Sequence, residues 1–138
     1  MISRSRYLWN SRFFDRHVGR VVVADPDEAA FSMVRQLTAP DRWQVMYASS
    51  AEELRSILHT GPVSLAVVDL AMLDGSPRLA AELADRSRRG LRVVVTTDEH
   101  NESNERRARM HGPVFYAPKP LNIRLLNHVV EGALGAAV

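Results

Sequence analysis

The sequence predicts an α/β protein in which an open parallel sheet carries helices on both faces. From Arg20 onward, apolar runs of strand length alternate with segments of helical periodicity, which is the pattern of such a sheet. A chain of 138 residues is long enough for one domain around one core. Hydrophobic residues make up 46% and charged residues 25% of the chain, which is the ordinary balance of a globular protein.

The composition excludes several classes of function. The chain has no cysteine, so a disulfide framework, a zinc–thiolate site and a thiol nucleophile are excluded. No apolar run approaches the roughly 20 residues of a transmembrane helix, and the basic N-terminus lacks the apolar stretch of a signal peptide. We therefore expect a cytoplasmic protein without membrane contact. The first 20 residues carry a net charge of +4 and the remainder about −2, which predicts no direct binding to nucleic acid.

The first third of the chain predicts two strands and the helix between them. The first strand covers residues 21–24 and is followed by Asp25. The helix places four apolar side chains on one face at helical spacing: Ala30, Met33, Val34 and Leu37. Pro40 closes this helix, and the second strand covers about 43–48.

The middle of the chain predicts two more helices around a third strand. Ser49 or Ser50 caps the first of these helices. Its apolar face has three residues: Leu54, Ile57 and Leu58. The third strand covers 64–68 and is followed by Asp69. Ser76, with a proline in the first turn after it, begins the next helix. Four side chains of that helix are expected to point inward: Leu79, Ala80, Leu83 and Ala84.

The last third predicts two further strands and two further helices. The fourth strand covers 91–95 and is followed by Thr96. The helix over about 102–111 is highly polar, so we expect it to be the weakest and most mobile element. It has only two side chains to bury: Ala108 and Met110. The last strand covers 114–117, and the last helix covers about 122–134. This helix is expected to bury four residues: Leu126, Val129, Val130 and Leu134.

Four side chains that can do chemistry stand just past the carboxyl ends of these strands: Asp25, Asp69, Thr96 and Lys119. Ligands of an open parallel sheet bind outside these ends, so we expect the four to converge on one rim. Lys119 is the only lysine in the chain, and its compact charge suits a single anionic oxygen better than the planar fork of arginine. Each residue alone could be a surface charge or a cap, and Asp25 could simply cap the first helix.

The residue types at this rim indicate phosphoryl chemistry. Two carboxylates supply the oxygen ligands that a hard cation such as Mg²⁺ prefers. One carboxylate can also act as a nucleophile and form an aspartyl phosphate. The hydroxyl and the ammonium can then bind oxygens of the phosphoryl group. No phosphate-cradling glycine loop follows the first strand, which disfavours a flavodoxin-like cofactor binder.

Residues 20–134 resemble the receiver domain of bacterial response regulators. Four segments carry the resemblance: 21–25 (VVVAD), 67–72 (VVDLAM), 93–97 (VVVTT) and 112–120 (GPVFYAPKP). The resemblance implies a flavodoxin-like (βα)5 fold, doubly wound, with strand order 2-1-3-4-5. It implies that Asp69 accepts a phosphoryl group from a histidine kinase or a phosphotransfer protein. It also implies that Thr96 bonds the phosphoryl oxygen and that Lys119 pairs with it.

The resemblance assigns further roles, and its main departure lies after the first strand. Asp25, Asp69 and the backbone carbonyl of Ala71 would hold Mg²⁺, and Tyr116 matches an aromatic switch residue. The peptide bond after Lys119 is usually cis in the family. The family's second acidic residue after the first strand is replaced here by Pro26, so we expect Mg²⁺ to bind weakly. Asp27 is more suited to the first turn of the following helix.

We expect a basic, aromatic N-terminal extension over residues 1–19 and a receiver domain over 20–138. The extension is either a docking arm for a partner, an acidic surface or a membrane headgroup layer, or a segment that is packed on its own domain or partly disordered. We favour the second interpretation, because its apolar positions fit no amphipathic helix. The chain is interpreted as a single-domain receiver that is phosphorylated on Asp69, signals through protein contacts, and has no enzymatic activity beyond self-catalysed phosphotransfer and dephosphorylation. The alternative is a receiver-like scaffold that works without phosphorylation. In either case the surface formed by 102–111, 114–117 and 122–134 is expected to meet a downstream protein or a second copy.

Overall fold

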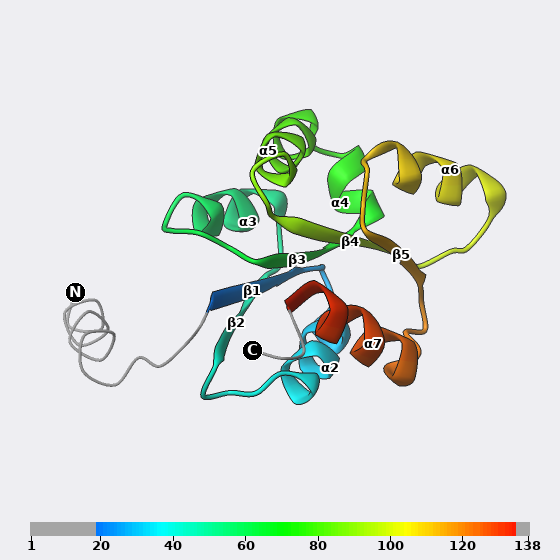
Figure 1. Cartoon of the computed structure of the whole chain (residues 1–138). Coiled ribbons are helices and arrows are strands. Elements are labelled where there is room, and N and C mark those ends of the chain that lie inside the picture. Colours follow the sequence, from blue (N-terminus) through cyan, green and yellow to red (C-terminus); the bar gives the residue numbers. More distant parts are fainter. Residues whose placement is uncertain (1–18, 135–138) are drawn as a thin grey trace.

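Five parallel strands form one sheet in the order β2-β1-β3-β4-β5 (Figure 1). The structure is a computed structural model, and it describes residues 19–134. The strands are β1 Gly19–Ala24, β2 Trp43–Ala48, β3 Leu65–Asp69, β4 Arg92–Thr97 and β5 Phe115–Pro118. This is the strand order that the sequence predicted. It places the first strand beside the third, so the order along the chain reverses between β1 and β3.

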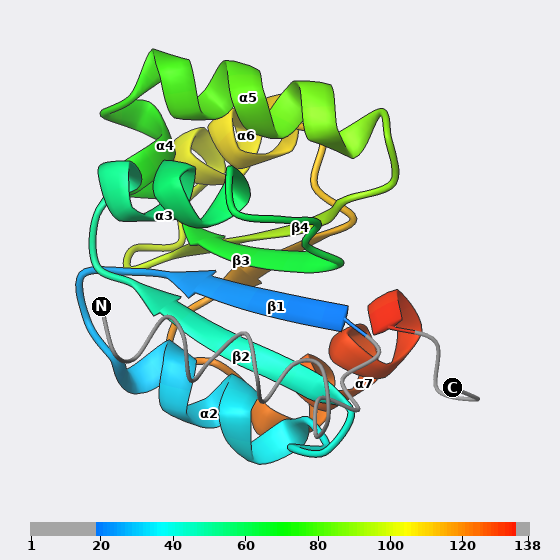
Figure 2. The same cartoon turned by 90° about the vertical axis from the view of Figure 1, so that its left-hand side faces the viewer.

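Helices cover both faces of the sheet, as expected (Figures 1 and 2). One face carries α2 Ala29–Leu37 and α7 Ile123–Leu134. The other face carries α3 Ala51–Leu58, α4 Leu70–Asp74, α5 Pro77–Ser87 and α6 Glu102–Met110. In Figure 2 the sheet is seen nearly edge-on between these two layers.

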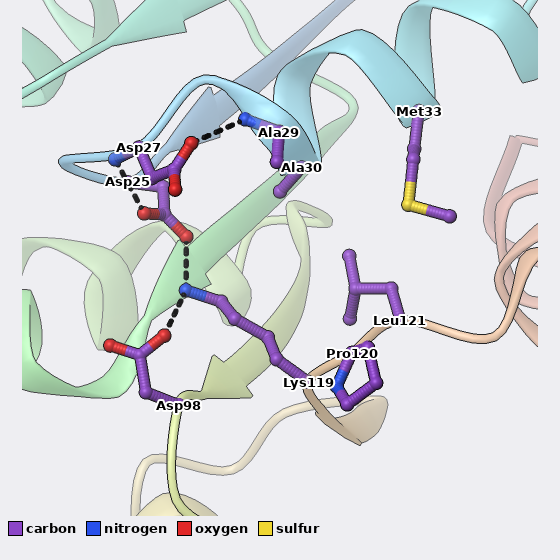
Figure 3. Close-up of a pocket in the computed structure, with 9 residues that line it drawn as sticks. All are labelled: Asp25, Asp27, Ala29, Ala30, Met33, Asp98, Lys119, Pro120 and Leu121. Carbon is purple, nitrogen blue, oxygen red and sulfur yellow. Dashed lines mark hydrogen bonds and ion pairs between the residues drawn. The ribbon is translucent and has the colours of Figure 1, made fainter.

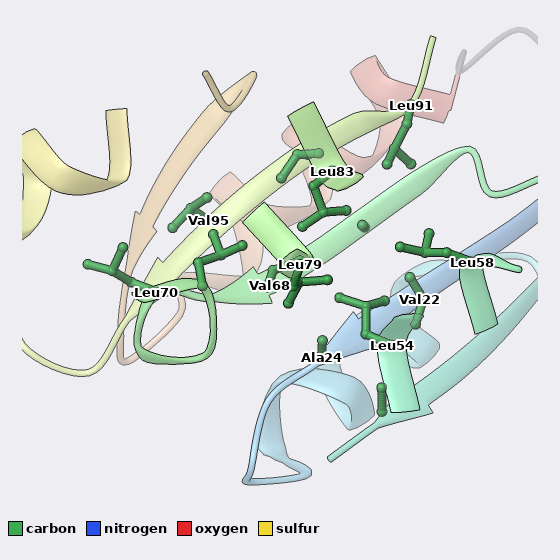
Figure 4. Packing of buried hydrophobic residues seen from close by; sticks show 14 of the residues in the cluster. Val22, Ala24, Leu54, Leu58, Val68, Leu70, Leu79, Leu83, Leu91 and Val95 are labelled. Carbon is green, nitrogen blue, oxygen red and sulfur yellow. The ribbon is translucent and has the colours of Figure 1, made fainter. Parts of the chain in front are cut away.

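The core lies in two apolar layers, one on each side of the sheet. Successive residues of β1 alternate between the layers, with Val22 and Ala24 on the side of α3 and α5, and Val21 and Val23 on the side of α2 and α7. Figure 4 shows the first layer, where Leu54 of α3 and Leu79 of α5 lie over Val22 and its neighbours. Because both faces of the central strands are covered, the middle of each is an unbroken apolar run, as in 21–24, 65–68 and 93–95, rather than apolar at every second position.

Polar side chains cap the starts of α3, α5 and α6. The hydroxyl of Ser50 accepts a hydrogen bond from the backbone of Glu53, so Ser50 rather than Ser49 is the cap of α3. The hydroxyl of Ser76 accepts from the backbone of Leu79 at the start of α5. The carboxamide of Asn101 caps α6 in the same way. These caps fix where each helix begins and hence how long the preceding loops are.

The structure corrects three expectations about the helices. Helix α4 was not expected, and it begins directly at Leu70 after the end of β3. Its apolar sequence reads as a continuation of the strand, and five residues are too few to show a helical period. Met110 is 80% exposed, so α6 buries Ala108 alone. Ala84 of α5 is exposed as well, because it lies at the edge of the apolar stripe of that helix.

The expected extension over residues 1–19 lies, apart from Gly19, outside the described residues, and so do the last four residues of the expected domain over 20–138. Gly19 is already the first residue of β1. A side chain at this glycine would collide with Trp43 and with the hydroxyl of Ser64, since a Cβ there would lie 2.7 Å from each. Among the described residues, none of the helices is long and apolar enough to cross a membrane.

Candidate functional site

The carboxyl ends of β1, β3, β4 and β5 bring the four expected side chains to one rim of the sheet. Asp69 ends β3 and lies opposite Thr96 of β4 in the strand register. Asp25 follows β1, whose last residue, Ala24, pairs with Val68. Lys119 follows β5, and its backbone amide donates to the carbonyl of Thr97. Parallel strands therefore place the four residues together, although up to 94 positions of sequence separate them.

The ammonium group of Lys119 binds three carboxylates. Its Nζ atom lies 2.5 Å from Asp25 Oδ2, 3.1 Å from Asp69 Oδ1 and 3.0 Å from Asp98 Oδ1. The side chains of Asp25 and Asp69 are 3% exposed, that of Lys119 is 18% exposed and that of Asp98 is 80% exposed. Figure 3 shows Lys119 reaching from the loop after β5 towards Asp25 and Asp98. One positive charge thus faces three negative ones.

Backbone contacts hold Asp25 and Asp27 in defined positions (Figure 3). Asp25 Oδ1 accepts a hydrogen bond from the backbone amide of Asp27 at 2.8 Å, and the backbone carbonyl of Asp25 accepts from the hydroxyl of Tyr47 at 2.7 Å. Asp27 Oδ1 in turn accepts from the backbone amide of Ala29 at the start of α2. Asp27 therefore serves the first turn of α2, and Asp25 points to Lys119 rather than capping that helix.

Asp98 was not anticipated from the sequence. The fourth strand was expected to end at residue 95, but β4 runs on to Thr97, so the first residue past the strand is Asp98. The expectation that site residues stand just past the carboxyl ends of the strands would have identified Asp98 as well, if the end of this strand had been known. Two consecutive threonines hide that end, because threonine is common both in strands and just beyond them.

The hydroxyl of Thr96 is buried and, among the described residues, has no hydrogen-bond partner. A buried hydroxyl without a partner costs free energy, so it is placed to bond an oxygen that enters the site. The neighbouring hydroxyl differs, because Thr97 Oγ1 donates to the carbonyl of Glu99. Thr96 therefore keeps a free donor beside Asp69.

Two hollows adjoin the carboxylates. One, of about 170 Å³, is lined by Asp69 and Ala71 on one side and by Asp98 and Arg107 on the other. Arg107 reaches it from α6 and pairs with Asp74 at 3.2 Å, so a second cation faces this hollow. The sequence offered no sign of Arg107, because its helix was identified only as a polar surface. The other hollow, of about 310 Å³, is mainly apolar and lies between α2 and residues 119–121 (Figure 3).

Solved structures share this architecture, although no family model matches the sequence and no curated protein resembles it closely enough to count as a relative. A response regulator from Thermotoga maritima superposes with a TM-score of 0.72 at 20% identity, covering 85% of this chain and 98% of that chain. The signal receiver domain of a histidine kinase from Clostridium thermocellum gives 0.71 at 17%, covering 85% and 98%. A CheY-like receiver domain protein from Methanospirillum hungatei gives 0.64 at 22%, covering 84% and 94%. This chain has the receiver fold.

The receiver fold is combined here with an incomplete set of ligands for a divalent cation. Pro26 offers no carboxylate, and Asp27 is turned to Ala29. The carbonyl of Ala71 already accepts a hydrogen bond from Gly75 within α4. Across residues 19–134, no three acidic, histidine or cysteine side chains are arranged to hold a metal ion. The residues present therefore do not fit a complete Mg²⁺ site of the kind that the resemblance implied.

Burial and charge act on the pKa values in this receiver site. Burial raises the pKa of Asp69, the contact with Lys119 opposes this, and the charges of Asp25 and Asp98 add to the rise. Burial alone would lower the pKa of Lys119, but its hydrogen bonds to Asp25, Asp98 and Asp69 outweigh burial and leave the pKa above its ordinary value. Lys119 is therefore a cation at every physiological pH, and the site has a net negative charge when its carboxyl groups are ionised.

Tyr116, which the resemblance matches to an aromatic switch residue, is buried on β5. Its hydroxyl lies 2.9 Å from the Nδ1 atom of His100, and the guanidinium of Arg109 lies over its ring at 5.8 Å. Burial raises the pKa of Tyr116, and the charge of Glu105 adds to the rise. The peptide bond between Lys119 and Pro120, just after β5, is cis, as the resemblance implied.

Proposed function

We propose that this chain works as a response regulator receiver that accepts a phosphoryl group on Asp69 and signals through protein contacts. The observation that carries the proposal is the free, buried hydroxyl of Thr96 beside Asp69. That hydroxyl lacks an acceptor among the described residues, and a phosphoryl oxygen on Asp69 would supply one. Lys119, already 3.1 Å from the Asp69 carboxylate, is the matching cation.

The transfer would proceed by attack of a carboxylate oxygen of Asp69 on the phosphorus of a phosphohistidine. The new O–P bond forms as the N–P bond breaks, and the departing imidazole nitrogen takes the electron pair and is protonated by solvent water. The donor would be a histidine kinase or a phosphotransfer protein, because these carry phosphohistidine. The hollow of about 170 Å³ beside Asp69 offers room for the group, and Arg107 on its far side adds positive charge.

We expect Mg²⁺ to contribute weakly at best, with Asp25 and Asp69 as its side-chain ligands. Pro26 removes the carboxylate that would complete the set. The positive charge that the phosphoryl group meets on arrival is then that of Lys119 and Arg107. This assignment leaves no catalytic role for the protein beyond its own phosphorylation and dephosphorylation.

The signal would leave the molecule through the surface of α6, β5 and α7. Three large apolar side chains are exposed there: Met110, Ile123 and Leu125. Val114, just before β5, is exposed as well. Large apolar side chains that are exposed on one surface are frequent in protein interfaces. A downstream protein or a second copy of the chain is the expected partner.

Mass spectrometry tests the assignment of Asp69. The protein is treated with acetyl phosphate and Mg²⁺, and we expect one phosphate adduct on the peptide that carries Asp69. Asp69→Asn should abolish the adduct, whereas Asp74→Asn, which removes an exposed carboxylate of the same hollow, should keep it. An adduct on another residue would contradict the assignment. If neither acetyl phosphate nor beryllium fluoride changes the protein, the phosphorylation-independent scaffold is the better description.

A further inference from the structure

Lys119 uses all of its hydrogen-bonding capacity inside the resting site. A lysine ammonium has three N–H donors and no acceptor. Each donor of Lys119 has its own carboxylate, on Asp25, Asp69 and Asp98. The three acidic residues come from the ends of β1, β3 and β4, so the ammonium is surrounded by three different elements of the fold. No other cation is hydrogen-bonded to these carboxylates among residues 19–134.

Two of these carboxylates need a cation in order to be buried. The side chains of Asp25 and Asp69 are almost fully enclosed, and a buried carboxylate without a counter-charge is strongly unfavourable. Lys119 supplies that charge from a side chain that is itself mostly covered. The site is thus neutralised in part by a group that is covalently attached to the chain.

A divalent cation held by both Asp25 and Asp69 would have to share the oxygens of Asp25 with donors already there, whereas Lys119 takes only Oδ1 of Asp69. Asp25 has no idle oxygen, because Oδ2 accepts from Lys119 and Oδ1 accepts from the backbone amide of Asp27. Metal–oxygen distances for Mg²⁺ are about 2.0–2.1 Å, so an ion on Asp25 and Asp69 would lie only a few ångströms from the ammonium. Two cations that close repel each other strongly in a buried site. Binding of Mg²⁺ and binding of the Lys119 ammonium group at these carboxylates are therefore mutually exclusive.

We infer that the ammonium of Lys119 is the resident cation of this site and excludes divalent metal from Asp25 and Asp69 by competition. The site is then a cage of three carboxylates around the Lys119 ammonium group, and Asp98 supplies the third carboxylate. Because Asp98 is exposed, its carboxylate can be replaced by another anion at the lowest cost in free energy. The inference concerns the resting protein and does not depend on phosphoryl transfer, so it stands or falls separately from the function proposed above.

Binding of Mg²⁺ alone, measured by calorimetry, tests the competition. We expect the wild-type protein to bind Mg²⁺ at least tenfold more weakly than Lys119→Ala, in which the cage is free. Adding Asp98→Asn to Lys119→Ala should remove most of that gain, because a ligand is lost. Arg92→Ala, which removes an exposed cation at the other end of the sheet, should bind Mg²⁺ as the wild type does. Wild-type binding as tight as that of Lys119→Ala would overturn the inference.

A second measurement needs no substitution. Because Lys119 is the only lysine, selective ¹⁵N labelling of lysine gives a single Nζ signal in NMR spectra. We expect this signal to stay in place at millimolar Mg²⁺ and to shift only when enough metal is added to displace the ammonium. Metal binding at the Asp25 and Asp69 carboxylates, seen by their own ¹³C shifts, with an unmoved Nζ signal would show that metal joins the lysine, and the inference would be wrong. This measurement decides the matter even if Lys119→Ala does not fold.

Discussion

The Nδ1 atom of His100 lies 2.9 Å from the hydroxyl oxygen of Tyr116, and the two rings are 5.6 Å apart. His100 belongs to the loop between β4 and α6, and Tyr116 lies on β5. Two residues earlier, the same loop carries Asp98, which binds Lys119. One short loop is therefore attached both to the acidic site and to the buried aromatic ring. A change in the partners of Lys119 can therefore reach Tyr116 through residues 98–100 and the contact between His100 and Tyr116.

We predict that His100→Ala loosens this connection. Without its partner, the hydroxyl of Tyr116 remains enclosed but loses a hydrogen bond, so the buried position of the ring becomes less favourable. Backbone amides of β5 and α6 should then exchange hydrogen faster than in the wild type. His128→Ala, an exposed histidine on α7, is the matched control and should leave exchange unchanged. Equal exchange in both variants would mean that packing alone holds Tyr116.

The same exchange measurement tests whether the ring acts as a switch. Beryllium fluoride, which imitates a phosphoryl group, should draw Thr96 towards Asp69 and alter the protection of α6 and β5. Helix α6 buries only Ala108, so its position should shift at little cost. If the ligand is bound and the exchange of both elements is identical with and without it, Tyr116 is a fixed residue of the core.

A carboxylate at position 26 should strengthen the binding of Mg²⁺. We predict that Pro26→Asp lowers the Mg²⁺ dissociation constant by about tenfold, which corresponds to about 1.4 kcal/mol of binding free energy. The added oxygen gives the ion a ligand that Lys119 does not hold. Pro62→Asp, an exposed proline near the opposite end of the sheet, is the control for added negative charge. An affinity unchanged by Pro26→Asp would mean that Asp25 or Asp27 already fills this position.

The raised pKa of Asp69 predicts how stability depends on pH. The folded protein holds the proton of Asp69 more tightly than the unfolded chain does, whose carboxyl titrates near 3.8. This contribution to stability is fully present below that pH and is lost as pH rises through the higher folded pKa. Asp69→Asn cannot ionise, so its unfolding free energy should rise relative to the wild type over the same interval.

Urea unfolding of both proteins from about pH 4 to pH 7 measures this difference. Asp41→Asn, which removes an exposed aspartate, controls for the loss of one negative charge. If the difference between Asp69→Asn and wild type shrinks as pH rises, the attraction of Lys119 outweighs burial, and the direction given for the pKa of Asp69 is wrong.

Truncation of a buried side chain in α5 and of an exposed side chain in α6 should have very different effects on stability. Leu79 of α5 is fully buried, so Leu79→Ala should reduce the free energy of unfolding by about 3 kcal/mol. Met110 of α6 is exposed, so Met110→Ala should change it by less than about 0.5 kcal/mol. Chemical denaturation of the two variants checks both values. A large effect of Met110→Ala would indicate that this side chain packs in solution.

The sequence predicts the sheet well because its central strands are buried on both faces. Runs such as 21–24 and 93–95 have no polar alternation, and only a covered parallel sheet tolerates that. The same property hides the boundary after β3, where an apolar strand passes directly into the apolar helix α4. Local sequence does not mark such a change, because both states bury the same kind of side chain.

The sequence predicted those residues of the candidate site that follow a strand whose end was correctly predicted. Asp25, Asp69 and Lys119 stand at clear ends, whereas Asp98 was missed because β4 continues through Thr97. The direction of a side chain was not predictable at all. That Asp27 turns to Ala29 while Asp98 turns to Lys119 depends on backbone geometry in two loops, which residue type alone does not determine.

The rarity of lysine in this chain has a practical consequence. Amine-directed reagents, such as succinimidyl esters, have one side chain to modify, and in the resting protein that amine is charged, hydrogen-bonded three times and mostly covered. Any event that releases Lys119 from its carboxylates exposes it to acylation. In the unaltered protein, the extent of acylation of Lys119 therefore measures how often its ammonium group is released from the three carboxylates.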